Sequence, residues 1–365
     1  MSKNFTNTFM LEALGLPLFT DIKSLSNYLG LSEKIIYLLS VKTQNYYKKF
    51  FLTKKRGGQR EILAPSYSLK LVQRWILREI LEKLPISSAA QAYIKGNGLG
   101  IKKNAEIHKN SLYILEIDFK DFFPSISRDK VFYLFRNIGY NILISNVLAN
   151  LCTFENYLPQ GGVCSPSLSN IICFKLDKRI HTLCLKRDIN YSRYADDLAF
   201  SCDNKVSLIK SKHLISRIAK DEGFKLNDSK TRYLSPISHK IVTGITIDNG
   251  VLKAKKELKK LVRPMIFRSI TSMDYTQNEK IRGIVAYVDS IEKGYKDSIL
   301  KYIASLSTKF DFVVFEDIVR EFNKHKFYKE VNDMVDKSKD YLSEEEFDDI
   351  SDIIDIRNKY LKSIC

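Results

Sequence analysis

The sequence predicts an α+β protein with helical ends, and two strand-like runs carry its most informative residues. Residues 112–119 contain Asp118, and residues 192–201 contain the adjacent pair Asp196 and Asp197. On either side, apolar residues recur at the three- and four-residue spacing of amphipathic helices. With 365 residues, 44% of them hydrophobic, the chain can bury a sizeable core across two or three subdomains.

In chain order, the same spacing predicts helices over residues 1–50, with a new start at Ser32. Residues 51–62 show two strand-like arms around a basic turn with paired glycines, which predicts a hairpin. The later expected elements are a helix over 68–83, a loop over 96–100, a strand over 112–119, a helix capped by Ser127, a loop over 158–166, a helix over 166–185, the Asp196-Asp197 hairpin, a helix over 207–221, a small hairpin over 241–252 and helices from 255 onward.

The charge is strongly basic and unevenly distributed. The formal net charge is +17, yet residues 331–365 carry ten acidic and five basic side chains, which leaves +22 on residues 1–330. Such a balance favours a polyanionic partner, and nucleic acid is the partner we expect. A dense basic stretch over 255–268 could follow a phosphate backbone or form a solvated helix face; its candidate RNA-binding residues are Lys255, Lys256, Lys259 and Arg263.

The cysteine pattern and hydropathy exclude several classes. None of the six cysteines forms a C-x-x-C pair and there are only five histidines, so we expect neither a zinc site nor a disulfide scaffold. No apolar run approaches twenty residues, and the first thirty residues lack a signal-peptide layout. The expectation is a cytoplasmic protein without a membrane partner.

Asp118, Asp196 and Asp197 are candidate catalytic residues and metal ligands, because ionised carboxylates near a core need a partner. Neighbouring strand residues point to opposite faces, so Asp196 and Asp197 can approach one ion only at a tight turn. Hard cations such as Mg²⁺ take carboxylate oxygens together with substrate phosphates, and pairs of such ions serve polymerases and nucleases. The residues therefore predict nucleotidyl transfer with two Mg²⁺ ions, against the alternative of a solvated Asp-Asp turn.

Three further segments fit contacts to a nucleotide, and each also has an ordinary structural explanation. Gln160 lies in a glycine-rich loop that could approach a sugar or phosphate, or could connect two helices. Lys54 and Arg60 flank a turn that could clamp a triphosphate or be solvated. One of Phe122 and Phe123 could press on a sugar and exclude a 2′-hydroxyl, while the other packs in the core.

Taken in order, these motifs resemble those of reverse transcriptases. The matching segments are 117–124 around Asp118, 158–161 around Gln160, Tyr194-Ala195-Asp196-Asp197, and Lys230-Thr231. Residues 104–108, with Asn104 and His108, resemble the N-A-x-x-H element of bacterial retron reverse transcriptases, and Val242-Thr243-Gly244 resembles their V-T-G element. The resemblance covers roughly residues 10–325.

The resemblance implies a right-hand polymerase with fingers, palm and helical thumb. The implied domains are N-terminal helices and fingers over 1–110, a palm with interleaved fingers elements over 111–250, a thumb over 251–325 and an acidic helical extension over 326–365. The three aspartates and the backbone carbonyl of Phe119 would hold the two Mg²⁺ ions. The dNTP would be contacted by Lys54, Arg60, Phe123, Gln160 and Lys230, and the RNA by Asn104, His108, Thr243, Gly244 and the basic stretch.

Enzymes that look like this copy a cognate structured non-coding RNA into multicopy single-stranded DNA (msDNA), primed from an RNA 2′-hydroxyl. They act in anti-phage defence, which implies a separate effector protein and leaves room for a higher-order ribonucleoprotein assembly. The alternatives are an intron-type or diversity-generating reverse transcriptase, a ribonucleoprotein scaffold that restrains an effector, and a nonspecific RNA-binding protein. The intact aspartate set favours an enzyme.

Overall fold

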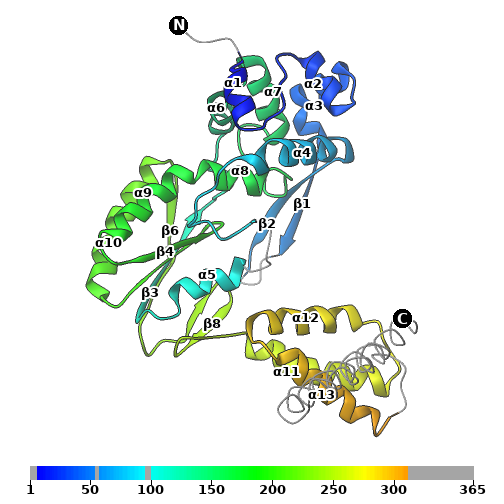
Figure 1. Cartoon of the computed structure of the whole chain (residues 1–365), viewed down its shortest axis with the longest axis vertical. Helices are drawn as coiled ribbons and strands as arrows, with labels where there is room; N and C mark the ends of the chain where they lie inside the picture. The colour runs from blue at the N-terminus through cyan, green and yellow to red at the C-terminus, as the bar shows by residue number, and fades with distance from the viewer. Residues whose placement is uncertain (1–5, 54–56, 95–99, 311–365) are drawn as a thin grey trace, which may run out of the picture. The chain divides into compact units, whose positions relative to one another are not determined.

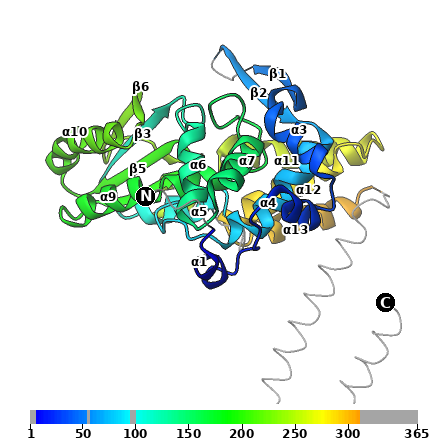
Figure 2. The same ribbon diagram turned by 90° about the horizontal axis from the view of Figure 1, so that it is seen from above.

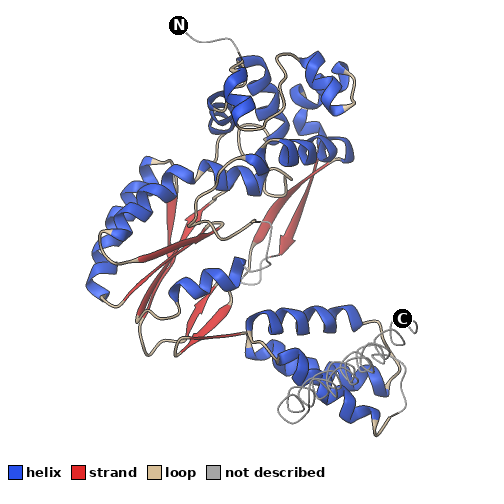
Figure 3. Ribbon diagram, in the orientation of Figure 1, coloured by secondary structure: helices blue, strands red, loops and turns tan. Residues whose placement is uncertain are grey.

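The structure is a computed structural model that describes residues 6–53, 57–94 and 100–310 (Figures 1 and 3). It divides into two compact units, Met1–Lys253 and Ala254–Cys365, and each unit is described by itself. The expected extension over 326–365 lies outside the described residues, as does Lys54.

A four-stranded antiparallel sheet forms the centre of the first unit. Its strands are β3 (Tyr113–Lys120), β4 (Asn190–Tyr194), β5 (Asp197–Cys202) and β6 (Lys225–Leu234), in the order β4-β5-β3-β6. Strand β3 therefore lies between two partners, and its apolar residues are buried. Strand β6 was not expected, because its sequence is polar and lysine-rich; it is an edge strand, where such residues are tolerated.

Helices cover both faces of this sheet (Figure 1). Helices α9 (Phe174–Leu185) and α10 (Lys205–Asp221) pack on one face, and α5 (Gly100–His108) packs on the other. Strand β4 shows the alternation directly: the side chains of Tyr191 and Arg193 bond to α9, while Ser192 between them bonds to α5. Successive strand residues point to opposite faces, so these three contacts fix which face each helix covers.

The N-terminal helices pack with later helices and carry a hairpin in the first unit. Ser32 and Ser127 are N-caps as expected, each accepting a bond from a backbone N–H three residues later. The expected hairpin is present as β1 and β2 and projects from the neighbouring helices in Figure 2. The elements are α1 (Thr8–Ala13), α2 (Ile22–Leu29), α3 (Glu33–Val41), η1 (Thr43–Tyr46), β1 (Tyr47–Thr53), β2 (Gln59–Pro65), α4 (Tyr67–Glu79), η2 (Leu81–Lys83), α6 (Arg128–Asn137) and α7 (Ile142–Cys152).

Two expected elements differ from the structure. The helix expected over 166–185 is divided into α8 (Ser165–Ile172) and α9, because the ψ angle of −2° at Cys173 interrupts the helical hydrogen-bond ladder. The small hairpin is a three-stranded sheet of β7 (Lys240–Val242), β8 (Ile245–Asp248) and β9 (Val251–Lys253). Its first turn has positive φ at Thr243 (48°) and Gly244 (83°), and a left-handed threonine is too rare to expect.

The second unit is helical where it is described, as the sequence predicts. Helices α11 (Lys256–Thr271), α12 (Asn278–Ile291) and α13 (Tyr295–Ser307) pack around an aliphatic core. That core contains Val262, Ile266, Ile270, Ile281, Ile299, Ile303 and Leu306. In the described part of the chain, no helix is long and apolar enough to cross a membrane.

Candidate active site

The three aspartates meet where β3 and β5 pair. Asp118 on β3 and Asp197 on β5 are direct partners in the antiparallel register. The turn that precedes β5 is tight, because Ala195 adopts a left-handed φ of 58°. The backbone N–H of Phe119 donates to the carbonyl of Asp196 at 3.0 Å, which fixes this turn against β3. The sheet thus gathers carboxylates that are almost eighty residues apart in the sequence.

The electrostatics of this group indicate that negative charge is crowded. Burial, together with the nearby Asp196 and Asp118 carboxylates, raises the pKa of Asp197 to about 7. The pKa of Asp196 is also raised, mainly by burial and then by Asp118. Asp118 itself is 7% exposed, and both its oxygens accept from Lys230 Nζ, at 2.9 and 2.8 Å. Lysine 230 therefore supplies the positive charge beside Asp118.

The donor set suits a hard divalent cation, although it is not closed around one. Over the described ranges, no group of three or more His, Cys, Asp or Glu side chains is arranged to hold a metal ion. Cations such as Mg²⁺ are commonly held by one or two carboxylates together with substrate phosphates, so a closed protein cage is not required. The pKa values of Asp196 and Asp197 are raised first by burial and then by the neighbouring carboxylates. A cation bound between these carboxylates would offset their mutual repulsion.

A cavity of about 390 Å³ opens beside the aspartates, within the first unit. Its walls include Glu116, Asp118, Asp197, Lys230, Arg232 and Thr243. Residues of β3, β5, β6 and the β7–β8 turn contribute to it, so the small sheet forms one wall of the site. The cavity combines these charged side chains with apolar ones such as Leu198 and Val242.

The residues expected to contact a nucleotide surround this site in part. Arg60 on β2 is exposed and close enough to lower the pKa of Asp196. The carbonyl of Gln160 accepts from the N–H of Leu63 at 2.8 Å, which ties the glycine-rich loop to strand β2. Phe123 is half-buried, whereas Phe122 is 3% exposed and packs in the aromatic core. This division agrees with the expectation that one ring is structural.

The expectation that Asn104 and His108 contact RNA is wrong for this structure, because they are 1% and 0% exposed. His108 Nε2 lies 2.7 Å from Ser192 Oγ, and His108 Nδ1 lies 2.8 Å from Ser201 Oγ. Ser192 donates to Asn104 Oδ1 at 2.6 Å, and Asn104 Nδ2 donates to Thr243 Oγ1 at 3.4 Å. The two motifs therefore form one hydrogen-bonded chain across the sheet face, which holds the Thr243-Gly244 turn in place.

The basic stretch of α11 is only partly free to bind a phosphate backbone. Lys255 and Lys256 are exposed. Lys259 is paired with Glu292, with Nζ at 2.8 and 2.9 Å from the two carboxylate oxygens. The guanidinium of Arg263 lies 5.2 Å from the centre of the Tyr302 ring, in a cation–π contact. The sequence pattern could not distinguish the exposed lysines from the paired one.

The sequence pattern did not predict one pair of residues near the site. Arg193 directly precedes the Tyr194-Ala195-Asp196-Asp197 motif, and its partner Asp177 lies on α9. Both side chains are 0% exposed and form an ion pair at 2.8 Å. The available signal was an arginine inside an otherwise apolar strand, since a charge in such a place needs a buried partner.

Comparison with known proteins now identifies the family. A profile described as "Reverse transcriptase (RNA-dependent DNA polymerase)" matches residues 52–283. The chain belongs to the reverse transcriptase family. This confirms the expected right-hand polymerase fold and RNA-directed DNA polymerase activity. Enzymes of this family use divalent metal ions.

The most informative relatives are retron enzymes. This reverse transcriptase is 35% identical to the "Retron Ec86 reverse transcriptase" of Escherichia coli over 85% of this chain and 96% of that one. It is 31% identical to the "Retron Mx65 reverse transcriptase" of Myxococcus xanthus over 76% and 70% of the two chains. Among solved structures, the apo telomerase of Candida tropicalis aligns at 15% identity with a TM-score of 0.49, covering 76% of this chain and 60% of that one. The sequence relatives make the chain a retron-type reverse transcriptase.

Proposed function

We propose that this reverse transcriptase joins deoxynucleotides at Asp118, Asp196 and Asp197 with the help of two Mg²⁺ ions. The single observation that supports this most is the register of β3 and β5, which pairs Asp118 with Asp197 beside a turn carrying Asp196. When bound, the two ions would activate the primer hydroxyl and neutralise the leaving pyrophosphate. The carbonyl of Phe119 is a proposed additional ligand.

The other residues would position the substrates. Arg60 and Lys54 would bind the triphosphate through charge-assisted hydrogen bonds, and Gln160 would contact the nucleotide near its sugar. The half-buried ring of Phe123 would lie against the sugar and select against a 2′-hydroxyl. Lys230 would leave Asp118 when cation and substrate arrive and would then protonate the leaving pyrophosphate.

We further propose that the template is a cognate structured non-coding RNA and that the product is msDNA primed from an RNA 2′-hydroxyl. Support comes from the retron relatives and from the net charge of +17. A separate effector protein and a role in anti-phage defence, within a ribonucleoprotein assembly, belong to the same proposal. The described cysteines are free and buried, which supports a reducing cytoplasmic location.

The aspartate assignment is tested by Asp196→Asn, which removes one negative charge and keeps the side-chain shape. We expect loss of primer extension by at least a hundredfold, with RNA affinity unchanged, because the carboxylate acts on reacting groups rather than on the RNA backbone. Asp188→Asn, at an exposed position after α9, is the matched control and should retain full activity. Weakened RNA binding by Asp196→Asn would contradict the assignment.

The template proposal is tested by purifying the enzyme co-expressed with its flanking genomic DNA and sequencing the bound nucleic acid. We expect one abundant short DNA joined to one structured RNA. Mixed RNA without DNA, from protein that still extends a supplied primer, would exclude the msDNA proposal and keep the polymerase.

A further inference from the structure

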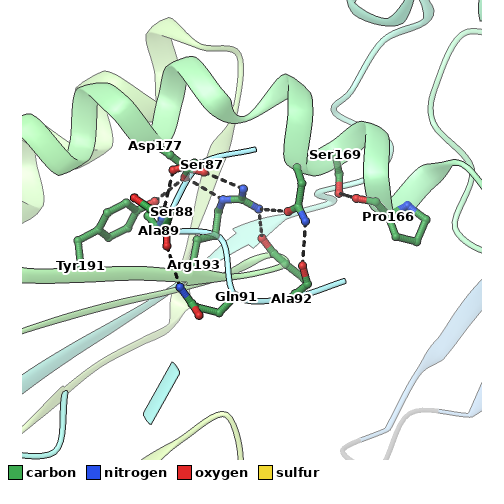
Figure 4. A network of polar contacts seen from close by, with 12 residues as sticks. Ser87, Ser88, Ala89, Gln91, Ala92, Pro166, Ser169, Asp177, Tyr191 and Arg193 are labelled. Atoms are coloured by element: carbon green, nitrogen blue, oxygen red, sulfur yellow. Dashed lines mark hydrogen bonds and ion pairs between the residues drawn. The ribbon is translucent and has the colours of Figure 1, made fainter. Parts of the chain in front are cut away.

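Arg193 is the largest fully buried side chain among the described residues, and it contacts three separate parts of the first unit (Figure 4). Its Nε and one terminal nitrogen donate to the two oxygens of Asp177 on α9, both at 2.8 Å. The other terminal nitrogen donates to Asn170 Oδ1 on α8 at 3.1 Å and to the carbonyl of Ala195 at 3.2 Å. The guanidinium thus makes four hydrogen bonds inside the protein, one of them to the turn that precedes β5.

The contact with Ala195 is the unusual one. Ala195 has a left-handed φ of 58°, a conformation that alanine rarely adopts without support from its surroundings. Its carbonyl immediately precedes Asp196 in the chain. A donor fixed on that carbonyl therefore restrains the backbone from which Asp196 and Asp197 project.

The guanidinium is itself held from every side, which makes it a rigid support. The main chain of Arg193 is also fixed: its backbone N–H donates to the carbonyl of Ala89 at 2.8 Å, and its carbonyl accepts from the N–H of Gln91 at 2.8 Å. Asn170 Nδ2 donates to the carbonyl of Ala92 at 2.8 Å, so the same amide joins Arg193 to the neighbouring segment. Asp177 is further fixed by the hydroxyl of Tyr191, which donates to it at 2.8 Å (Figure 4).

A buried ion pair is a weak source of stability, because the cost of removing two charges from water offsets most of their attraction. In some proteins such pairs are retained for the geometry that they impose. We propose that Arg193, oriented by Asp177 and Asn170, is a positioning residue that holds the Ala195 carbonyl and so sets Asp196 and Asp197 for cation binding. This inference rests on the proposed function of the two aspartates.

The test measures cation binding directly rather than activity alone. Mn²⁺ binding is followed by electron paramagnetic resonance, using the full chain with a template, a 3′-deoxy primer and the matching dNTP. The signal lost in Asp196→Asn defines the site. Arg193→Lys keeps the charge but lacks the planar fork needed to reach Asp177 and the Ala195 carbonyl together.

We expect Arg193→Lys to raise the Mn²⁺ dissociation constant and the Mg²⁺ concentration for half-maximal extension at least fivefold, with template affinity within twofold of the wild type. The double variant Arg193→Met/Asp177→Leu leaves no unpaired charge behind and should show the same cation defect. Leu176→Ala, a buried neighbour on α9, controls for a general loss of stability and should leave both cation values unchanged.

The outcomes separate the two proposals. If the wild type binds Mn²⁺ at a site that Asp196→Asn removes, and both Arg193 variants bind it equally well, the positioning role is wrong and the proposed function stands. If Leu176→Ala weakens cation binding as much as Arg193→Lys at an equal loss of melting temperature, the effect is general destabilisation and the positioning role is also wrong. If the wild type has no site that Asp196→Asn removes, the proposed function fails and this inference fails with it.

Discussion

Burial of neutral His108 is expected to make the enzyme's stability fall steeply in mild acid. Ser192 donates its only hydroxyl proton to Asn104, so it must accept from His108 Nε2–H, and Nδ1 then accepts from Ser201. Burial lowers the pKa of His108 from 6.5 to about 3. Below pH 6.5 the unfolded chain binds a proton that the folded chain excludes, so stability decreases as pH falls. Between pH 8 and pH 5 this linkage amounts to about 2 kcal/mol.

The assay is urea unfolding of the nucleic-acid-free protein at pH 8 and pH 5, for the wild type and for His108→Gln. The variant is expected to be less stable than the wild type at pH 8. From pH 8 to pH 5, its free energy of unfolding should fall by about 2 kcal/mol less than that of the wild type, because glutamine does not titrate there. His181→Gln, at an exposed position on α9, should retain the wild-type difference. Equal pH dependence in wild type and His108→Gln would refute a buried neutral imidazole.

Two further predictions concern the glycine-rich loop and the basic helix. Gly161→Ala is expected to cost ~2 kcal/mol or more and to raise the KM for dNTP, because a Cβ would lie 2.7 Å from a β2 carbonyl at a φ of +115°. Gly283→Ala on α12, with no atom within 4 Å of the new Cβ, should instead stabilise the protein by about 0.5–1 kcal/mol. Urea unfolding measures both changes. Replacing both Lys255 and Lys256 by Gln should weaken the salt dependence of single-stranded RNA binding. The slope of the logarithm of the affinity against the logarithm of the salt concentration should become smaller by ~1.4. Lys259→Gln should change that slope less, because its Nζ is already paired with a carboxylate; an equal change would contradict the pairing.

The parts of the site that carry distinctive chemistry could be predicted from the sequence. Asp118 and the Asp196-Asp197 pair were recognisable because carboxylates inside apolar strands are costly, and the sheet register brings them together. The sequence also divided Phe122 and Phe123 into a core ring and an accessible ring, and the resemblance to reverse transcriptases assigned the accessible one to Phe123.

Residues whose roles depend on three-dimensional neighbours could not be predicted. Asn104 and His108 form a recognisable motif, yet only the packing of α5 on β4 shows that both are buried. Lys256 and Lys259 belong to the same basic stretch of the sequence. Lys259 is less free to bind RNA because it pairs with Glu292, thirty-three residues later in the chain. Local periodicity contains no information about such distant partners, so exposure had to come from the structure.

The position of Lys230 links these observations to the catalytic cycle. Its ammonium lies on Asp118 with both carboxylate oxygens within 2.9 Å, although 55% of the lysine side chain is exposed to solvent. Only the lysine side of this pair is exposed, because 10% of the Asp118 side chain is accessible to solvent. Lys230 can therefore move into solvent, and under the proposed mechanism a cation with substrate phosphates would replace it as the positive partner of Asp118. Both side chains of the Arg193–Asp177 pair, by contrast, are 0% exposed. Under the proposed mechanism, the site would combine a fixed support behind the turn with an exchangeable charge in front of it, and repeated binding and release of nucleotides requires both.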